Sequence, residues 1–190
     1  QGNLVCLTRA DGTSIQMEYD LDDHMVSLRT PDGVDWQQAY DGRGLLVSQT
    51  DPLGATTRFE YDARGQLESQ TNARQAVTRL RYDRHGLVAA VIDALGHESR
   101  FEHDPLGNLL RQVDPLGQAS RYEYDAKGRL LATAGPDGAG VRCEYDAEDQ
   151  LVRYTDEMGA QTRLQYVGIG QIGKRLQADG HSVEYRYDTE

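Results

Sequence analysis

The chain has 190 residues, 38% of them apolar without glycine, and a formal net charge of -11. The 20 glycines bring the apolar share near the globular average, so the chain can bury a core. The charge argues against a nucleic-acid-binding face and an anionic membrane surface, because phosphates require clustered lysine and arginine. No apolar run approaches the ~18 residues that span a bilayer. We therefore expect no nucleic acid partner and no membrane insertion by this segment.

A tyrosine returns every 21 residues, and all but one of these positions are followed at once by aspartate. The positions are Tyr19, Tyr40, Tyr61, Tyr82, His103, Tyr124, Tyr145, Tyr166 and Tyr187; Val167 replaces the aspartate once. Such regularity is typical of a tandem array of supersecondary units. We predict one array of about nine repeats over residues 1–190, and we expect it to be a segment of a longer array truncated at both ends.

One repeat contains two predicted turns and two predicted strands. Residues 51–54, Asp-Pro-Leu-Gly, have the preferences of a type I turn. Residues 57–61 alternate polar and apolar side chains, as a half-buried strand does. Residues 62–65 form the next turn, where Gly65 requires a positive φ, and a second strand begins at Leu67. Nothing has helical periodicity, so we predict an all-β chain of tandem β-hairpins in a curled antiparallel meander.

The repeat aligns residues of one kind in ladders. The turn glycine recurs at Gly44, Gly65, Gly86, Gly107, Gly128 and Gly170, and Asp23 and Asp149 occupy its place twice. The second strand begins with Met25, Leu46, Leu67, Val88, Leu109, Leu130, Leu151 and Ile172. Arg58, Arg79, Arg100, Arg121, Arg142 and Arg163 form one charged ladder, and Glu60, Glu102, Glu123 and Glu144 form another.

We interpret the two charged ladders as a solvated outer face and the aromatic stripe as a core whose phenols bond to the backbone. The alternatives are a ligand-binding charge stripe and an aromatic surface that grips sugars or bases. Nine hairpins make roughly eighteen strands, more than the ~10 at which a twisted open sheet usually curls. We therefore expect a coil or barrel wall with the tyrosine and leucine face inside, and exposed edge strands that invite self-association.

Several patterns typical of ligand sites fall in unsuitable places. Residues 168–173 match the dinucleotide pattern GxGxxG, but they lie at a repeat turn instead of opening a helix. Asp20, Asp22 and Asp23 lack EF-hand spacing. The histidines, which are His24, His85, His97, His103 and His181, include no pair at metal-binding helix spacing. We assign no catalytic, cofactor-binding or metal-binding residue, and we predict no enzyme and no cofactor.

The two cysteines, Cys6 and Cys143, lie several repeats apart in different phases of the repeat. If each repeat adds two strands, the array advances by roughly 10 Å per repeat. A disulfide requires Cα atoms within about 7 Å. We therefore predict no internal disulfide unless the sheet curls fully back.

Residues 121–130 read Arg-Tyr-Glu-Tyr-Asp-Ala-Lys-Gly-Arg-Leu, and Asp-Pro-Leu-Gly turns accompany this string. The pattern resembles the YD repeat of the bacterial Rhs (rearrangement hot spot) proteins over the whole chain. The same repeat occurs in insecticidal toxin-complex subunits, wall-associated bacterial proteins and animal teneurins. The family's self-cleavage boundary has a leucine after the turn glycine, whereas Ala55 and Gln118 follow it here. Self-cleavage is therefore not carried over.

This resemblance implies a hollow β-shell that encloses a toxic C-terminal domain. The implied role is a non-catalytic shell segment of a polymorphic toxin, secreted or delivered to a target cell, often by type VI secretion. Its partners would be the remainder of the same shell and the enclosed toxin domain. The alternative is a cell-surface binding module that contacts glycans or a protein partner.

Overall fold

The computed structural model describes residues 2–188, and these form eighteen β-strands and no helix. No described helix could therefore cross a membrane. The chain divides into two compact units, Gln1–Glu98 and Ser99–Glu190. Strands of the first unit are β1 (Cys6–Thr8), β2 (Ser14–Tyr19), β3 (Met25–Arg29), β4 (Asp35–Tyr40), β5 (Leu46–Thr50), β6 (Thr56–Tyr61), β7 (Leu67–Thr71), β8 (Val77–Tyr82) and β9 (Val88–Ile92).

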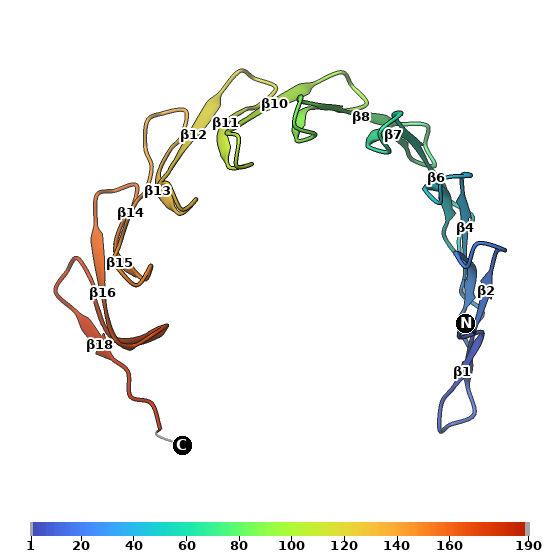
Figure 1. Cartoon of the computed structure of the whole chain (residues 1–190), viewed down its shortest axis with the longest axis horizontal. Helices are drawn as coiled ribbons and strands as arrows, with labels where there is room; N and C mark the ends of the chain where they lie inside the picture. The colour runs from blue at the N-terminus through green and yellow to red at the C-terminus, as the bar shows by residue number, and fades with distance from the viewer. Residues whose placement is uncertain (1, 189–190) are drawn as a thin grey trace. The chain divides into compact units, whose positions relative to one another are not determined.

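The second unit contains the other nine strands. They are β10 (Glu98–His103), whose first residue closes the first unit, β11 (Leu109–Val113), β12 (Ala119–Tyr124), β13 (Leu130–Ala134), β14 (Arg142–Tyr145), β15 (Leu151–Thr155), β16 (Gln161–Gly168), β17 (Gln171–Leu176) and β18 (Ser182–Glu184). In each unit every strand pairs antiparallel with the next one in sequence. The predicted meander of hairpins is confirmed, and Figure 1 shows that the ribbon of each unit is curved.

The two turns of a repeat have the same backbone geometry. Asp62 donates its N–H to the carbonyl of Gln66, and Gly65 donates to the carbonyl of Asp62. The turn at Asp51 repeats this pattern with Ala55 and Gly54. Every glycine of the predicted ladder has a positive φ, between 74° and 90°, and Asp23 and Asp149 both have a φ of 66°. The predicted turn conformation is therefore confirmed, including the two aspartates that replace glycine.

A β-bulge interrupts the pairing at the last residue of each strand that ends in the repeat tyrosine. Glu60 pairs with Ser69 and Tyr61 pairs with Leu67, so one residue of β7 is skipped between them. A bulge inserts an extra residue on one strand and increases the local twist. The same register shift recurs at Tyr19, Tyr40 and Tyr82 in the first unit. The bulges thus give a physical reason for the curvature of the ribbon.

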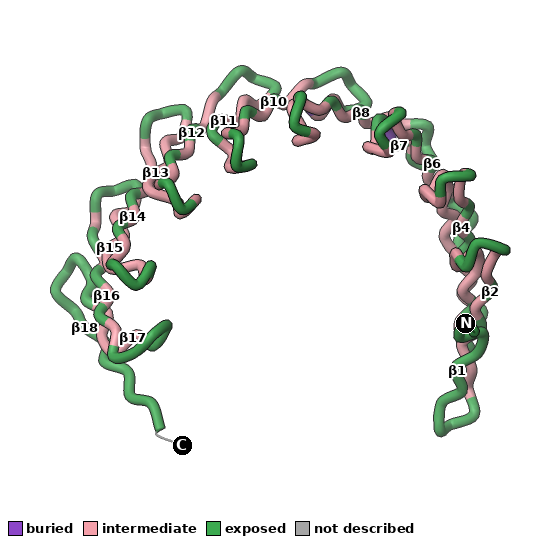
Figure 2. Tube along the Cα trace, in the orientation of Figure 1, coloured by how far each residue is buried: buried purple, intermediate pink, exposed green. Residues whose placement is uncertain are grey.

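The sheet is a single layer, so few side chains are buried. The residues that are most buried differ from those that the sequence predicts. Figure 2 shows mostly intermediate and exposed residues. Tyr187 is exposed, and the other repeat tyrosines and the first residues of the second strands are only half-buried. The expectation of a buried tyrosine and leucine face is therefore wrong for the described residues. The reason is that no second layer of described residues covers it. The two buried residues, Ser69 and Ala90, are each 5% exposed.

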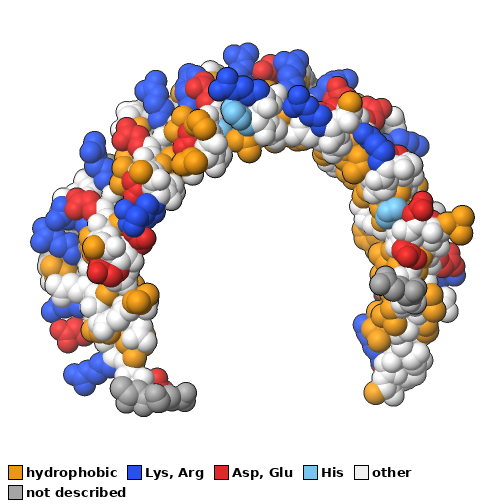
Figure 3. Space-filling view, viewed as in Figure 1, with side chains coloured by type: hydrophobic (Ala, Val, Ile, Leu, Met, Phe, Trp, Pro, Cys, Tyr) orange, Lys and Arg blue, Asp and Glu red, His pale blue; other side chains and the backbone are white. Residues whose placement is uncertain are grey.

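Ser69 and Ala90 lie on the charged face of the sheet. Ser69 pairs directly with Glu60 on one side and Arg79 on the other, and paired residues of antiparallel strands share a face. Long charged side chains cover a small neighbour with their aliphatic stems while the charged groups stay in water. Figure 3 shows lysine and arginine side chains along the convex side of each ribbon, with apolar side chains along the concave side.

Candidate functional site

The repeat tyrosine ties each hairpin to the preceding one. Its hydroxyl donates to the carbonyl of the residue 15 positions earlier, which stands at or near the start of a strand in the preceding repeat. The bonds are Tyr19–Leu4 (3.1 Å), Tyr40–Met25 (3.2 Å), Tyr61–Leu46 (2.9 Å), Tyr82–Leu67 (2.9 Å), Tyr145–Leu130 (3.0 Å), Tyr166–Leu151 (2.9 Å) and Tyr187–Ile172 (3.0 Å). The predicted backbone partner of the phenol is confirmed.

Two positions of this tyrosine ladder lack the bond. The hydroxyl of Tyr124 has no hydrogen-bond partner among residues 2–188. His103 carries no phenol, and its Nδ1 is a buried atom without a partner in the described structure. The hydroxyls of the other repeat tyrosines are engaged in hydrogen bonds that join neighbouring repeats. Their role in the described structure is therefore a structural one.

The aspartate after the tyrosine caps the turn. Oδ1 of Asp62 accepts the N–H groups of Arg64 (2.8 Å) and Gln66 (2.9 Å). In the other turn of the repeat, Oδ1 of Asp51 accepts from Leu53 and Ala55, both at 2.9 Å. These bonds satisfy backbone donors that the tight turn leaves unpaired. They explain why aspartate begins both turns.

The residue after the turn glycine bridges to the next repeat. Nε2 of Gln66 donates to the carbonyl of Gly86 at 2.9 Å. Oε1 of Gln150 accepts the N–H of Gly170 at 2.7 Å. His24 instead stacks on the ring of Tyr40, with ring centroids 4.7 Å apart. Sequence reasoning missed this row of bridges because the residue type varies from repeat to repeat.

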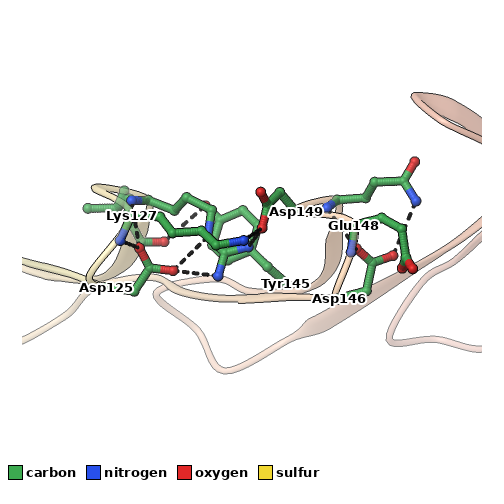
Figure 4. Close-up of polar contacts among 9 residues, drawn as sticks. Asp125, Lys127, Tyr145, Asp146, Glu148 and Asp149 are labelled. Atoms are coloured by element: carbon green, nitrogen blue, oxygen red, sulfur yellow. Dashed lines mark hydrogen bonds and ion pairs between the residues drawn. The ribbon is translucent and has the colours of Figure 1, made fainter.

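The most extensive of these bridges surrounds Arg129, and Figure 4 labels its partners Asp125, Asp149 and Tyr145. Its guanidinium pairs with Asp125 at 2.5 Å and with Asp149 at 2.6 Å. It also lies 4.6 Å from the ring centroid of Tyr145, a cation–π contact. Lys127 adds a second ion pair to Asp149 at 2.5 Å. Four charged side chains thus join two consecutive turns on one edge of the ribbon.

The pKa shifts in this network favour the charged forms. The backbone N–H and guanidinium of Arg129 lower the pKa of Asp125, and the hydrogen bond from Lys127 lowers the pKa of Asp149. The hydrogen bond to Asp125 raises the pKa of Arg129, and burial raises the pKa of Tyr145. General acid–base catalysis works best with a pKa near the working pH. This arrangement holds the turns together and does not prepare a proton transfer.

The charged face is exposed, and its ion pairs cross between strands. Glu102 pairs with Arg111 at 2.7 Å, Glu144 with Arg153 at 2.8 Å, and Lys174 with Glu184 at 3.1 Å. The ladder arginines Arg58, Arg79, Arg121, Arg142 and Arg163 are exposed and form no ion pair with the residues that the structure describes. The interpretation as a solvated face is confirmed, but Glu102 and Glu144 pair with second-strand arginines that sequence reasoning missed.

The patterns typical of ligand sites form turns or hairpins. Residues 168–173 lie in the hairpin of β16 and β17, so the GxGxxG match opens no helix. Asp20 caps its turn by accepting the N–H groups of Asp22 and His24, and Asp23 has a positive φ. No group of three or more histidine, cysteine, aspartate or glutamate residues in the described part of the chain could hold a metal ion. Cys6 is exposed, Cys143 is half-buried, and both thiols are free.

Three histidines pair with turn aspartates. Nδ1 of His24 lies 3.1 Å from Asp20, Nδ1 of His97 lies 2.9 Å from Asp93, and His181 lies 2.9 Å from Asp179. His85 accepts a hydrogen bond from Arg84. The position of His24 and His97 four residues after the aspartate is the signal that could have predicted their contact.

Comparison with known proteins places this repeat in a family. The RHS repeat model matches residues 40–77, 62–98, 82–115 and 103–139, which together cover 40–139, more than half of the chain. No curated protein sequence matches the chain.

Solved structures of toxin-complex proteins share the fold. They include a crystal structure of TcdB2-TccC3-Cdc42, a Tc holotoxin pore from Photorhabdus luminescens with a TccC3 mutation, and TcdB2-TccC3 without its hypervariable C-terminal region. Each is similar with a TM-score of 0.77 and 18% identity over 98% of this chain. The chain spans 11% of the length of each of these proteins. From the repeat-model match over more than half of its residues, the chain belongs to the RHS repeat family.

Proposed function

We propose that this chain is a non-catalytic wall segment of an Rhs-type shell that encloses a C-terminal toxin domain. The observation that carries the proposal is the unbroken 21-residue repeat, which builds curved single-layer ribbons from hairpins tied by the tyrosine hydroxyl. A wall needs extended area and regular spacing, and solenoid repeats supply both. The family match and the shared fold of the Tc structures support this role.

The two faces of the ribbon suit a wall with different surroundings on each side. The convex face carries exposed charges, as expected next to water. The concave face combines half-buried aromatic residues with polar ones, such as Phe59 beside Gln70. Such a mixed surface can line a chamber without the continuous apolar area that would capture any protein. The proposal assigns no catalytic residue and no cofactor to this segment.

The wider setting of the proposal is a bacterial effector that is secreted or delivered to a target cell, with type VI secretion as the route. The remainder of the shell and the enclosed toxin domain would be its partners. The similarity to a Tc holotoxin pore supports delivery to a target cell by analogy, and the type VI route rests on the family resemblance alone.

Protection of the toxin domain from proteolysis tests the proposal. We would treat the full-length product of the gene with a nonspecific protease and follow the region after the repeats. We expect that region to survive until the repeats unfold in denaturant. Cleavage of the region as fast in the full-length protein as in isolation would refute enclosure.

A second candidate is a cell-surface module that binds a protein partner. Four turn residues favour it, because the turn geometry does not use their side chains: Leu53, Leu95, Leu116 and Met158 are 93%, 82%, 83% and 92% exposed. Labelling of intact producer cells with an antibody to the repeats distinguishes the two candidates. A surface module is labelled on intact cells, whereas a shell stored before delivery is labelled only after lysis.

A further inference from the structure

A groove recurs between consecutive turns along one edge of the ribbon. In the first unit it has a volume of ≈ 360 Å³ and is lined by Asp62, Arg64, Glu68, Arg81, Tyr82 and Asp83, among others. The equivalent groove 84 residues later has a volume of ≈ 550 Å³. Its lining includes Asp146, Glu148, Val152, Tyr166, Val167 and Ile169. We name the first the mixed groove and the second the acidic groove.

The acidic groove has lost every basic residue of its counterpart. Glu148 stands where the mixed groove has Arg64, and Gln165 stands where it has Arg81. Two acidic positions have become apolar, because Val152 replaces Glu68 and Val167 replaces Asp83. The result is a groove whose carboxylates come from the turn between β14 and β15 and whose exposed aliphatic side chains come from the hairpin of β16 and β17.

The carboxylates of the acidic groove differ in their partners. Asp146 caps its turn through the N–H groups of Glu148 and Gln150. The side-chain carboxylate of Glu148 has no hydrogen bond or ion pair within residues 2–188. Figure 4 shows Glu148 beside Asp146 and away from the Lys127–Asp149 ion pair. Glu148 is therefore an exposed anion that the fold does not use.

The exposed aliphatic residues of the groove, Val167 and Ile169, belong to a hairpin that departs from the repeat. Strand β16 continues past Tyr166, and Gly168 pairs with Gln171, so Val167 and Ile169 stand 69% and 90% exposed. The bond from Gly170 N–H to Gln150 holds the tip against the acidic turn.

Local packing accommodates this hairpin. A Cβ at Gly173 would lie 2.3 Å from Cγ1 of Val167, so glycine at this position leaves room for the valine. The equivalent position of the preceding repeat carries Val152, and the position 84 residues earlier, beside the mixed groove, carries Ala89. The backbone geometry of the turn does not depend on the side chains of Val167 and Ile169. These two exposed side chains therefore form an apolar surface without a structural role in the hairpin.

We propose that the acidic groove docks an extended polypeptide segment that carries a lysine or arginine next to an aliphatic residue. Glu148 receives the cationic group, with Asp146 adding to the negative potential. Val152, Val167 and Ile169 receive the aliphatic side chain. The charge of the groove selects this occupant over a nucleic acid or an anionic membrane, which would be repelled. The inference does not depend on enclosure of a toxin.

Fluorescence anisotropy with a labelled octapeptide of alternating lysine and leucine tests the proposal on the whole chain. We expect saturable binding to the wild type. Glu148→Gln and Ile169→Ser should each weaken it about tenfold, the loss that accompanies 1.4 kcal/mol. Both side chains are exposed, so the variants should fold, and circular dichroism checks this.

Matched controls separate the groove from the overall charge of -11. Glu123→Gln removes the same charge from an exposed glutamate outside the groove, and Leu106→Ser makes a comparable apolar-to-serine change at the equivalent turn position, where Leu106 is 74% exposed. Both controls should bind like the wild type. The proposal is overturned if Glu148→Gln behaves like Glu123→Gln, if a lysine–serine peptide binds as tightly, or if no saturable binding occurs.

Discussion

The hydrogen bond of the repeat tyrosine's phenol explains most directly why a tyrosine recurs every 21 residues. Its hydrogen bond reaches a backbone carbonyl 15 residues earlier, at or near the start of a strand in the preceding repeat, so tyrosine is preferred over phenylalanine at this place. A net contribution of about 0.5–1.5 kcal/mol is typical of one such bond. The ladder therefore adds modest stability at each junction, and the sum extends along the array.

Tyr61→Phe should lower the free energy of unfolding by about 0.5–1.5 kcal/mol, because the bond from its hydroxyl to Leu46 is lost. Urea denaturation provides the measurement. Tyr124→Phe is the matched control, since the Tyr124 hydroxyl has no partner among the described residues, and it should change the midpoint little. Equal losses in both variants would show that the hydrogen bond is not the cause.

Acid should weaken the turn network around Arg129. The pKa of Asp125 is lowered in the folded chain by the Arg129 backbone N–H and guanidinium. A lowered carboxyl pKa gives stability that is present above the unfolded value of about 3.9 and is lost as pH falls below it through the folded pKa. Between pH 5 and pH 2, Asp125→Asn should therefore lose less stability than the wild type. Parallel urea midpoints across this range would contradict the assignment.

At the scale of the element, the turn depends on one residue with a positive φ. Gly65→Ala should cost about 1–2 kcal/mol, because φ is +82° there and an L-residue is disfavoured in that region. Gly42→Ala in the preceding turn is the control, since Gly42 has no positive φ and nothing lies within 4 Å of an added Cβ. Thermal unfolding should separate the two variants, and a loss at Gly42 as large as at Gly65 would disprove the backbone explanation.

The elements could be predicted because each repeats a local rule. The alternation in residues 57–61 and the glycine at Gly65 depend only on strand and turn geometry. The burial of Ser69 could not be predicted in this way, because it depends on Glu60 and Arg79 from both neighbouring strands. The hydrogen bond from Gln66 to Gly86 could not be predicted for the same reason, because it joins residues 20 positions apart.

The hairpin of β16 and β17 departs from the repeat, and the sequence shows this departure but does not predict its structural consequence. Val167 in place of aspartate is the one exception to the tyrosine–aspartate pattern, and the sequence predicts a repeat turn at the GxGxxG match of residues 168–173. The structure has a turn there, and it adds a longer strand and an exposed aliphatic tip that the sequence pattern does not indicate. Departures from local rules are expected at functional sites, and the acidic groove lies at this departure.

At the scale of the whole molecule, the outermost described strands, β1 and β18, are the candidates for contact with another chain. Within its unit, β1 pairs only with β2 among the described residues, and β18 pairs only with β17. Both strands are exposed along their whole length. Unpaired edge strands are templates for pairing with another chain, and lysine on such an edge blocks the pairing.

We therefore expect the chain to associate as its concentration rises, and sedimentation at several concentrations provides the measurement. The double variant Leu7→Lys and Val183→Lys, at edge-strand residues that are 48% and 41% exposed, should sediment as a monomer. The double variant Leu53→Lys and Leu116→Lys carries the same added charge at turn tips and should associate like the wild type. A wild-type chain that stays monomeric at high concentration would show that the edges of β1 and β18 are protected by their own geometry. If only the turn variant lost association, the chains would contact each other through their turns and not through their strand edges.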